Sequence, residues 1–192
     1  GPRMLSYRLY VIEETEIPPS NMLPTHINRS VRLLKDGIDY AKTMGGYVDL
    51  TTSSDPDFLE EDEVKASTGL RLMLEAGVSE HQITFSSDGQ GSMPIFGKDG
   101  AFLGLGVGKV TSLYREVRDS ILTEGVSITQ ALKTVTANPA DLLKLSSKGR
   151  IAAGKDADLV LVEKDTLHIH TVLAKGRLMV QNGTAVQKGT FE

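Results

Sequence analysis

Residues 23–29, with the sequence LPTHINR, and residues 83–92, with the sequence ITFSSDGQGS, decide the fold expected of this chain. Each stretch is a short apolar segment that leads to a charged or metal-capable side chain, His26 in the first and Asp88 in the second. Barrel enzymes present their chemistry in this way, on the loops that follow the carboxyl ends of parallel strands. The two stretches therefore predict a parallel α/β fold whose reactive side chains meet at one rim of the sheet.

Strand and helix patterns alternate around these two stretches. Short apolar runs precede amphipathic runs that begin with capping residues and end at glycine, which is typical of strand-to-helix units. We expect three such units in series, and this arrangement predicts the last part of a (β/α)8 TIM-type barrel. The predicted strands lie at 22–25, at 47–52 and from residue 83 onward. The helices that follow these strands are predicted at 30–43, 61–75 and 109–123. Two short helices, capped by Ser127 and Asn138, are predicted at 127–135 and 138–145.

The pattern changes from residue 149 onward. Residues 157–162, 169–174 and 177–180 alternate as strands do, and Lys-Gly at 175–176 and Asn-Gly at 182–183 are typical of hairpin turns. The sequence therefore predicts two domains. We expect residues 1–146 to form the partial barrel and residues 147–192 to form a small antiparallel β-sandwich module.

Composition limits the classes of function. Of 192 residues, 40% are hydrophobic and 24% are charged, which is ordinary for a folded globular protein. The net charge of -4 and the scattered lysines and arginines argue against a nucleic-acid partner. The absence of cysteine leaves only nitrogen and oxygen ligands for a metal. No apolar run approaches the roughly 20 residues of a membrane span, and no signal-peptide core follows the first residues, so we expect a cytoplasmic protein with no membrane contact.

His26 and Asp88 are the candidate metal ligands. A neutral imidazole at the end of a barrel strand can bind zinc, and a carboxylate in the matching place can bind a metal and accept a proton from bound water. Each has a simpler alternative. A single histidine is more often an ordinary polar side chain, and Asp88 followed by Gly89 is equally compatible with an Asx-turn.

Arg29 and Ser92 are the candidate substrate contacts. Arg29 follows His26 by three residues, and its planar guanidinium can bind a carboxylate through two hydrogen bonds. Ser92 follows a flexible Gly-Gln-Gly and can offer a hydroxyl to a ligand. The alternatives are a surface arginine paired with an acidic neighbour and a serine that only forms a turn.

The other histidines are less suited to a metal site. His168 and His170 form an H-x-H pair, but they fall in the predicted β module, so we favour a structural role for both. His81 precedes its predicted strand and belongs to the opposite rim of the barrel.

The chain resembles the isoaspartyl (β-aspartyl) dipeptidase branch of the amidohydrolase superfamily. The resemblance runs from about residue 15 to residue 192 and rests on four strings in fixed order: LPTHINR, GGYVDLTTS, SSDGQGS and the closing KGTFE. It covers only the C-terminal half of such an enzyme. It implies a (β/α)8 barrel with a flanking β-sandwich, two zinc ions, and hydrolysis of dipeptides joined through the aspartate side chain.

The same resemblance implies roles for four residues. His26 corresponds to a metal ligand, Asp88 to a metal ligand that also transfers the proton, and Arg29 and Ser92 to contacts with the substrate carboxylate. A two-histidine motif, a bridging lysine and another histidine of the family have no counterpart here. Because catalytic zinc takes three protein ligands, the two matched positions are insufficient by themselves.

Three interpretations follow from the missing ligands. The chain is the C-terminal portion of an isoaspartyl dipeptidase, completed by an N-terminal half or by association of identical chains. It is alternatively a catalytically incomplete fragment with a structural or assembly role. A third interpretation changes the substrate to a cyclic amide, as in the dihydroorotase and hydantoinase relatives.

Overall fold

The computed structural model describes residues 10–54, 59, 62–97 and 99–189. At the centre of the fold lie two parallel strands, β1 (Val48–Thr51) and β2 (Ile83–Ser86), paired from Val48 opposite Ile83 to Thr51 opposite Ser86. Their side chains are buried almost throughout. A strand covered on both faces is typical of an α/β protein. The carboxyl ends of both strands point toward the same edge, as the sequence predicted.

Helix α2 (Val31–Met44) follows a short 3-10 turn, η2 (Ile27–Arg29). The Ser30 hydroxyl accepts a hydrogen bond from the Leu33 backbone N–H, which caps the helix at its start. Gly45 ends the helix in the left-handed conformation at φ 71°, where glycine meets no steric penalty. Both predicted helix ends are therefore confirmed.

The segment at residues 22–25 differs from the prediction, since it is not a regular strand. It contacts the sheet through the backbone hydrogen bond from Asp49 N–H to Pro24 O at 2.9 Å. Proline has no N–H to donate, so it cannot continue a ladder on its own strand. The segment nevertheless places His26 beside the end of β1.

Helix α3 (Ala66–Glu75) begins five residues later than predicted, and residue 61, the predicted start, lies outside the described residues. Two backbone groups ahead of the helix have other partners. Val64 N–H donates to Asn28 O, and Asp62 O accepts from Val31 N–H, both at 2.9 Å. These bonds hold residues 62–64 against η2 and the start of α2, so the helix starts only after them.

Three further helices follow β2 along the chain. Ser127 caps α5 as predicted, with its hydroxyl accepting from Gln130 N–H. Asn138 does not cap α6, because the helix begins one residue earlier, after Thr136. The Asn138 side chain is instead buried and donates to the Glu80 and Ile83 carbonyls. The three helices are α4 (Ser112–Leu122), α5 (Ile128–Lys133) and α6 (Ala137–Leu142).

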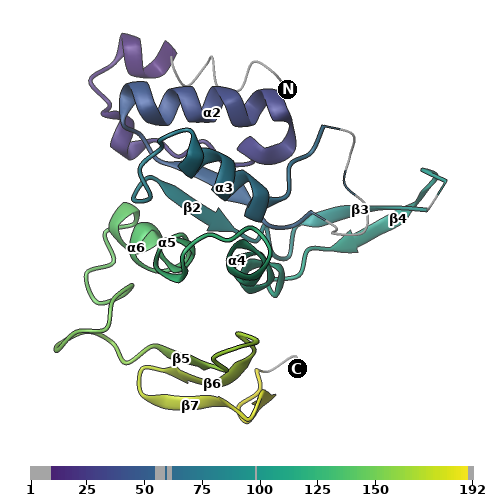
Figure 1. Ribbon diagram of the computed structural model, residues 1–192, viewed down its shortest axis with the longest axis vertical. Helices are drawn as coiled ribbons and strands as arrows, with labels where there is room; N and C mark the ends of the chain where they lie inside the picture. Colours follow the sequence, from purple (N-terminus) through teal and green to yellow (C-terminus); the bar gives the residue numbers. More distant parts are fainter. Residues whose placement is uncertain (1–9, 55–58, 60–61, 98, 190–192) are drawn as a thin grey trace.

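The glycine-rich stretch between β2 and α4 forms a β-hairpin that the sequence pattern did not reveal. Strands β3 (Ser92–Phe96) and β4 (Phe102–Val107) pair antiparallel, with Met93 opposite Gly106 and Ile95 opposite Gly104. Figure 1 shows the hairpin projecting sideways from the helices. Apolar residues of β4, including Leu103 and Leu105, are more than half exposed.

The C-terminal part is an antiparallel sheet with strand order β5-β6-β7-β8, as expected for the β module. Both predicted hairpin turns are present, and the two residues of each have positive φ, which suits a tight type I′ turn. The Tyr114 hydroxyl of α4 donates to Leu167 O at 2.8 Å, linking this sheet to the helices. The strands are β5 (Leu159–Val162), β6 (Ile169–Ala174), β7 (Arg177–Gln181) and β8 (Thr184–Ala185).

The hydrophobic core lies around the parallel pair. Figure 1 shows β2 between α2 and the group formed by α4, α5 and α6. The chain thus has an α/β fold, while the partial barrel and the boundary at residue 146 stay predictions. Within the described part of the chain, no helix has the length and apolar character that crossing a membrane requires. The core side chains are Ile27, Leu34, Tyr40, Ala41, Val48, Leu50, Ala66, Leu70, Met73, Val78, Ile83, Phe85, Val117, Val126 and Ala131.

Candidate functional site

His26 lies at the carboxyl end of β1. Its backbone has φ 60°, a left-handed conformation that is uncommon outside glycine and clusters at functional sites. Its ring Nδ1 lies 2.6 Å from the hydroxyl of Thr51, the last residue of β1. This contact orients the imidazole and leaves Nε2 for a ligand.

Asn28 fastens the His26 segment to the sheet. The side chain is fully buried, donates to the carbonyls of Thr51 (3.0 Å) and Val64 (2.9 Å), and accepts from Thr51 N–H (2.8 Å). A buried amide that satisfies three backbone groups allows little freedom of position. Asn28 therefore holds η2, the end of β1 and the segment that precedes α3 at fixed positions relative to one another.

Asp88 lies two residues beyond the end of β2, on a loop held against the chain that follows the hairpin. Gln90 N–H donates to Gly108 O, and Gly108 N–H donates to Gly91 O. Because Gln90 N–H is engaged in this way, Asp88 does not form the Asx-turn considered above. No other described side chain pairs with its carboxylate, and Asp88 itself has φ 49°.

An open cleft of about 800 Å³ lies beside this loop. Three of the four candidate residues, Arg29, Asp88 and Ser92, line it, whereas His26 does not. The β3–β4 hairpin forms one side and the first part of α4 another. The fold therefore brings residues separated by about sixty positions in the sequence to one surface.

Arg29 is already partly engaged. Its Nη1 donates to the Glu63 carboxylate at 2.7 Å and its Nη2 to the Ser53 hydroxyl at 2.9 Å. The Glu63 side chain is only 4% exposed and also accepts from the Ser54 hydroxyl. Arg29 thus pairs with an acidic neighbour, as one interpretation of the sequence expected, and its role as a substrate contact stays a prediction although it lines the cleft. A guanidinium has five N–H groups, so three stay available to a ligand.

A buried carboxylate, Asp49, joins three segments beneath this edge of the sheet. It accepts hydrogen bonds from the hydroxyls of Thr25 (2.7 Å), Thr84 (2.8 Å) and Ser86. Burial raises the pKa of the Asp49 carboxyl above its usual value, although these three hydrogen bonds and nearby His26 lower it. The sequence signal was an aspartate between two apolar residues of a predicted strand, Val48 and Leu50.

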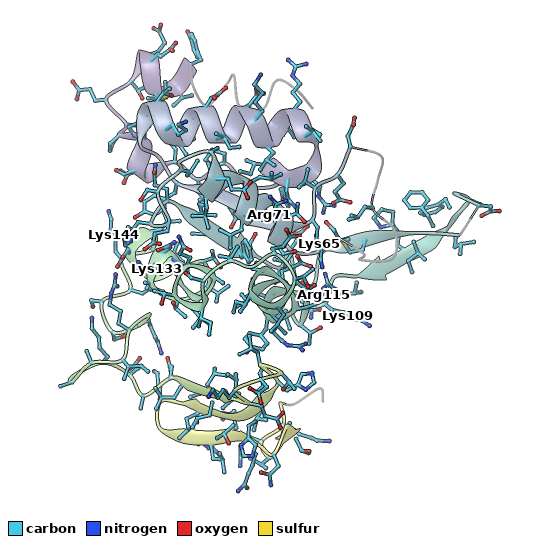
Figure 2. All side chains as sticks on the ribbon, in the orientation of Figure 1. Lys65, Arg71, Lys109, Arg115, Lys133 and Lys144 are labelled. Carbon is cyan, nitrogen blue, oxygen red and sulfur yellow. The ribbon has the colours of Figure 1, made fainter. Side chains whose placement is uncertain are left out.

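Arg115 and Lys109 are further cleft residues that sequence reasoning missed. Arg115 donates through Nη2 to the carbonyls of Thr52 and Ser54 and contacts the buried Glu116 at 3.2 Å. Figure 2 shows the labelled Arg115 and Lys109 near each other, beside α4 and the base of the hairpin. No sequence motif marks either residue, because the cleft forms only when the hairpin and α4 come together.

The described residues do not complete a catalytic metal site. His26 and Asp88 are suitable donors at neighbouring strand ends, but in the described part of the chain no group of three or more His, Asp or Glu residues is placed so that it could hold a metal ion. Catalytic zinc takes three protein ligands. The donor set of the described residues therefore falls short of a catalytic zinc site.

The remaining histidines lie away from the cleft. His81 precedes β2 and is exposed, at the end of the strand opposite to Asp88. His168 and His170 are exposed in the C-terminal sheet, where His170 contacts the Thr171 hydroxyl. The position of His81 agrees with the prediction, while a structural role for His168 and His170 stays a prediction.

Comparison with known proteins identifies the relatives of this fold. A β-aspartyl dipeptidase structure from Fervidobacterium islandicum AW-1, in complex with β-Asp-Leu dipeptide, is 37% identical, with a TM-score of 0.83 over 99% of this chain and 47% of that one. A second structure of the dipeptidase from that organism is 33% identical, with a TM-score of 0.80 over 99% of this chain and 46% of that one. The chain thus spans about half the length of these relatives.

A shorter similarity links the chain to an allantoinase from Enterococcus faecalis (strain ATCC 700802 / V583). It is 41% identical over 51 residues, which are 27% of this chain and 11% of the allantoinase. The sequence profile of the amidohydrolase family matches residues 16–186, which include the parallel pair, the cleft and most of the C-terminal sheet. The chain therefore belongs to the amidohydrolase family.

Proposed function

We propose that the chain carries the C-terminal part of an isoaspartyl dipeptidase, a hydrolase that cleaves dipeptides joined through the aspartate side chain. The observation that carries the proposal is the cleft that Arg29, Asp88 and Ser92 line together. The similarity to the F. islandicum enzyme bound to β-Asp-Leu supports the substrate class. Because the chain spans about half of that enzyme, the activity proposed is that of the complete protein.

The substrate carboxylate is bound by Arg29 and Ser92 in this proposal. Arg29 is held at its position by Glu63 and Ser53, so little side-chain freedom is lost when a ligand binds. The Ser92 hydroxyl lies on the same cleft, at the start of β3. Two or three charge-assisted hydrogen bonds to one carboxylate favour an acidic dipeptide over an uncharged ring.

Asp88 is the proton carrier in this proposal. Its carboxylate is free of hydrogen bonds from other described residues and faces the cleft, so it can accept a proton from the attacking water. The same carboxyl can then deliver that proton to the departing amine. The tight backbone contacts of its loop with residue 108 keep it in place during both transfers.

Members of the amidohydrolase family are typically metal-dependent. We propose zinc as the metal and His26 and Asp88 as two of its ligands, with the missing ligands supplied from outside these residues. An N-terminal half or a second copy of the chain is the source we propose. The cytoplasm is the compartment we propose.

The short match to allantoinase favours a second candidate, hydrolysis of a cyclic amide. The two candidate functions differ in the role of Arg29, because only the dipeptide has a free carboxylate that this side chain can bind. Parallel assays with β-Asp-Leu and with a hydantoin separate them.

The test measures zinc-dependent hydrolysis of β-Asp-Leu by the complete protein that contains these residues, beside the 192-residue chain. Asp88→Asn should abolish hydrolysis, since an amide cannot carry the proton, whereas the exposed Asp165→Asn should leave it unchanged. Arg29→Met should raise KM by about 10- to 100-fold, the range for losing a hydrogen bond to a charged group. Turnover that survives in Asp88→Asn would refute the role of Asp88, and hydrolysis of the hydantoin alone would favour the second candidate.

A further inference from the structure

Three cationic side chains line the cleft, and their pairing differs. Arg29 is neutralised by the buried Glu63, and Arg115 by the buried Glu116. Lys109 lines the same cleft, is exposed, and forms no ion pair or hydrogen bond through its side chain with any described residue. Among the described residues, Lys109 is therefore the cleft cation whose charge no carboxylate neutralises.

The position of Lys109 is set by contacts with the Asp88 loop. A Cβ added at Gly108 would lie 2.7 Å from the Asp88 carbonyl oxygen, and one added at Gly89 would lie 2.5 Å from a methyl of Val110. The residues on both sides of Lys109 are thus packed directly against this loop. Lys109 consequently stays at the rim of the cleft next to the reacting centre.

Apolar side chains form part of the cleft lining. Met93, Ile95 and Val107 of the hairpin line it, and none of them carries a charge. A ligand that fits must place an apolar group against these side chains. The cleft therefore offers a carboxylate contact, apolar surface and a second cation.

We propose that Lys109 binds the C-terminal carboxylate of the substrate. The ligand class is an acidic dipeptide with an apolar second residue, whose first carboxylate meets Arg29 and Ser92 and whose second carboxylate meets Lys109. The inference rests on the proposed function for its substrate class. It adds a specificity-determining residue outside the four taken from the resemblance.

The experiment titrates the 192-residue chain with β-Asp-Leu and with its C-terminal amide, which lacks the second carboxylate, and follows binding by NMR chemical shifts. Lys109→Met should raise the Kd of β-Asp-Leu about fivefold, the effect of an exposed ion pair worth up to about 1 kcal/mol. The Kd of the amide should not change. Added salt should weaken the binding of β-Asp-Leu more in the unchanged chain than in the variant.

The matched controls are Lys109→Arg, which should retain the preference for the acid, and Lys144→Met. Lys144 is exposed and lies outside the cleft, so its replacement changes net charge equally and should leave both Kd values unchanged. An equal rise in both Kd values with Lys109→Met, or no change in either, would overturn the inference, as would absence of binding to the unchanged chain. Hydrolysis is measured separately, so binding selectivity without hydrolysis would refute the proposed function alone.

Discussion

The buried amide of Asn28 provides the sharpest test of how the cleft is held together. Replacing it with alanine removes three hydrogen bonds and leaves Thr51 N–H, Thr51 O and Val64 O without these partners. A buried polar group left unpaired costs about 1–3 kcal/mol. Since water can reach some of these groups, we expect Asn28→Ala to lower the free energy of unfolding by about 3–5 kcal/mol.

The measurement is urea unfolding followed by circular dichroism, with Asn21→Ala as the matched control. Asn21 is exposed, so the same substitution there should change the free energy of unfolding by no more than about 0.5 kcal/mol.

Asn28→Asp provides a second check, because a carboxylate keeps the acceptor for Thr51 N–H but cannot donate to the two carbonyls. Its stability should recover in part as the pH falls, when the protonated carboxyl regains one donor. A loss below about 1 kcal/mol for Asn28→Ala would refute the reasoning, because one ordinary hydrogen bond accounts for that much.

Two further predictions concern stability. Gly46→Ala should lower the free energy of unfolding by about 1–3 kcal/mol, the usual effect of overpacking, because the added Cβ would lie 2.1 Å from the hydroxyl oxygen of the buried Tyr40. Urea unfolding measures this change, and an unchanged midpoint would contradict the close packing of Gly46 against Tyr40. The hydrogen bond from Lys133 holds the pKa of the Glu80 carboxyl below its usual 4.5. This ion pair therefore stabilises the folded state above pH 4.5, and its contribution is lost as the pH falls through the lowered pKa. Glu80→Gln should therefore cost up to about 1 kcal/mol at pH 7 and nearly nothing at a pH below the lowered pKa. Equal losses at both pH values would show that the ion pair is not responsible.

Much of the local structure was predictable because short-range chemistry decides it. Ser30 and Gly45 bound α2 through a side-chain cap and a left-handed backbone, and both signals depend only on neighbouring residues. The turns at 175–176 and 182–183 are of the same kind. The late start of α3 and the role of Asn138 were missed, because each depends on hydrogen bonds to distant segments.

Some residues of the candidate site were likewise predictable from local sequence, and others were not. His26, Asp88, Arg29 and Ser92 stand out in the sequence, because each follows a short apolar run or a flexible glycine stretch and together they lie in strings that resemble one enzyme family. The buried carboxylate Glu63 and the cation Lys109 carry no such mark. Their importance comes from burial, pairing or exposure, which are properties of the folded chain.

The amino-acid sequence by itself determined the α/β class, the antiparallel C-terminal strands and the identity of the four candidate residues, because alternation, capping and turn chemistry act over a few positions. Only the tertiary structure decided that the glycine-rich stretch forms a β-hairpin along the cleft and that Glu63 forms an ion pair with Arg29. It also decided that Lys109 has no ion-pair partner among the described residues. The physical reason is distance along the chain. Burial and ion pairing join groups tens of residues apart, and no local pattern encodes which of them will meet.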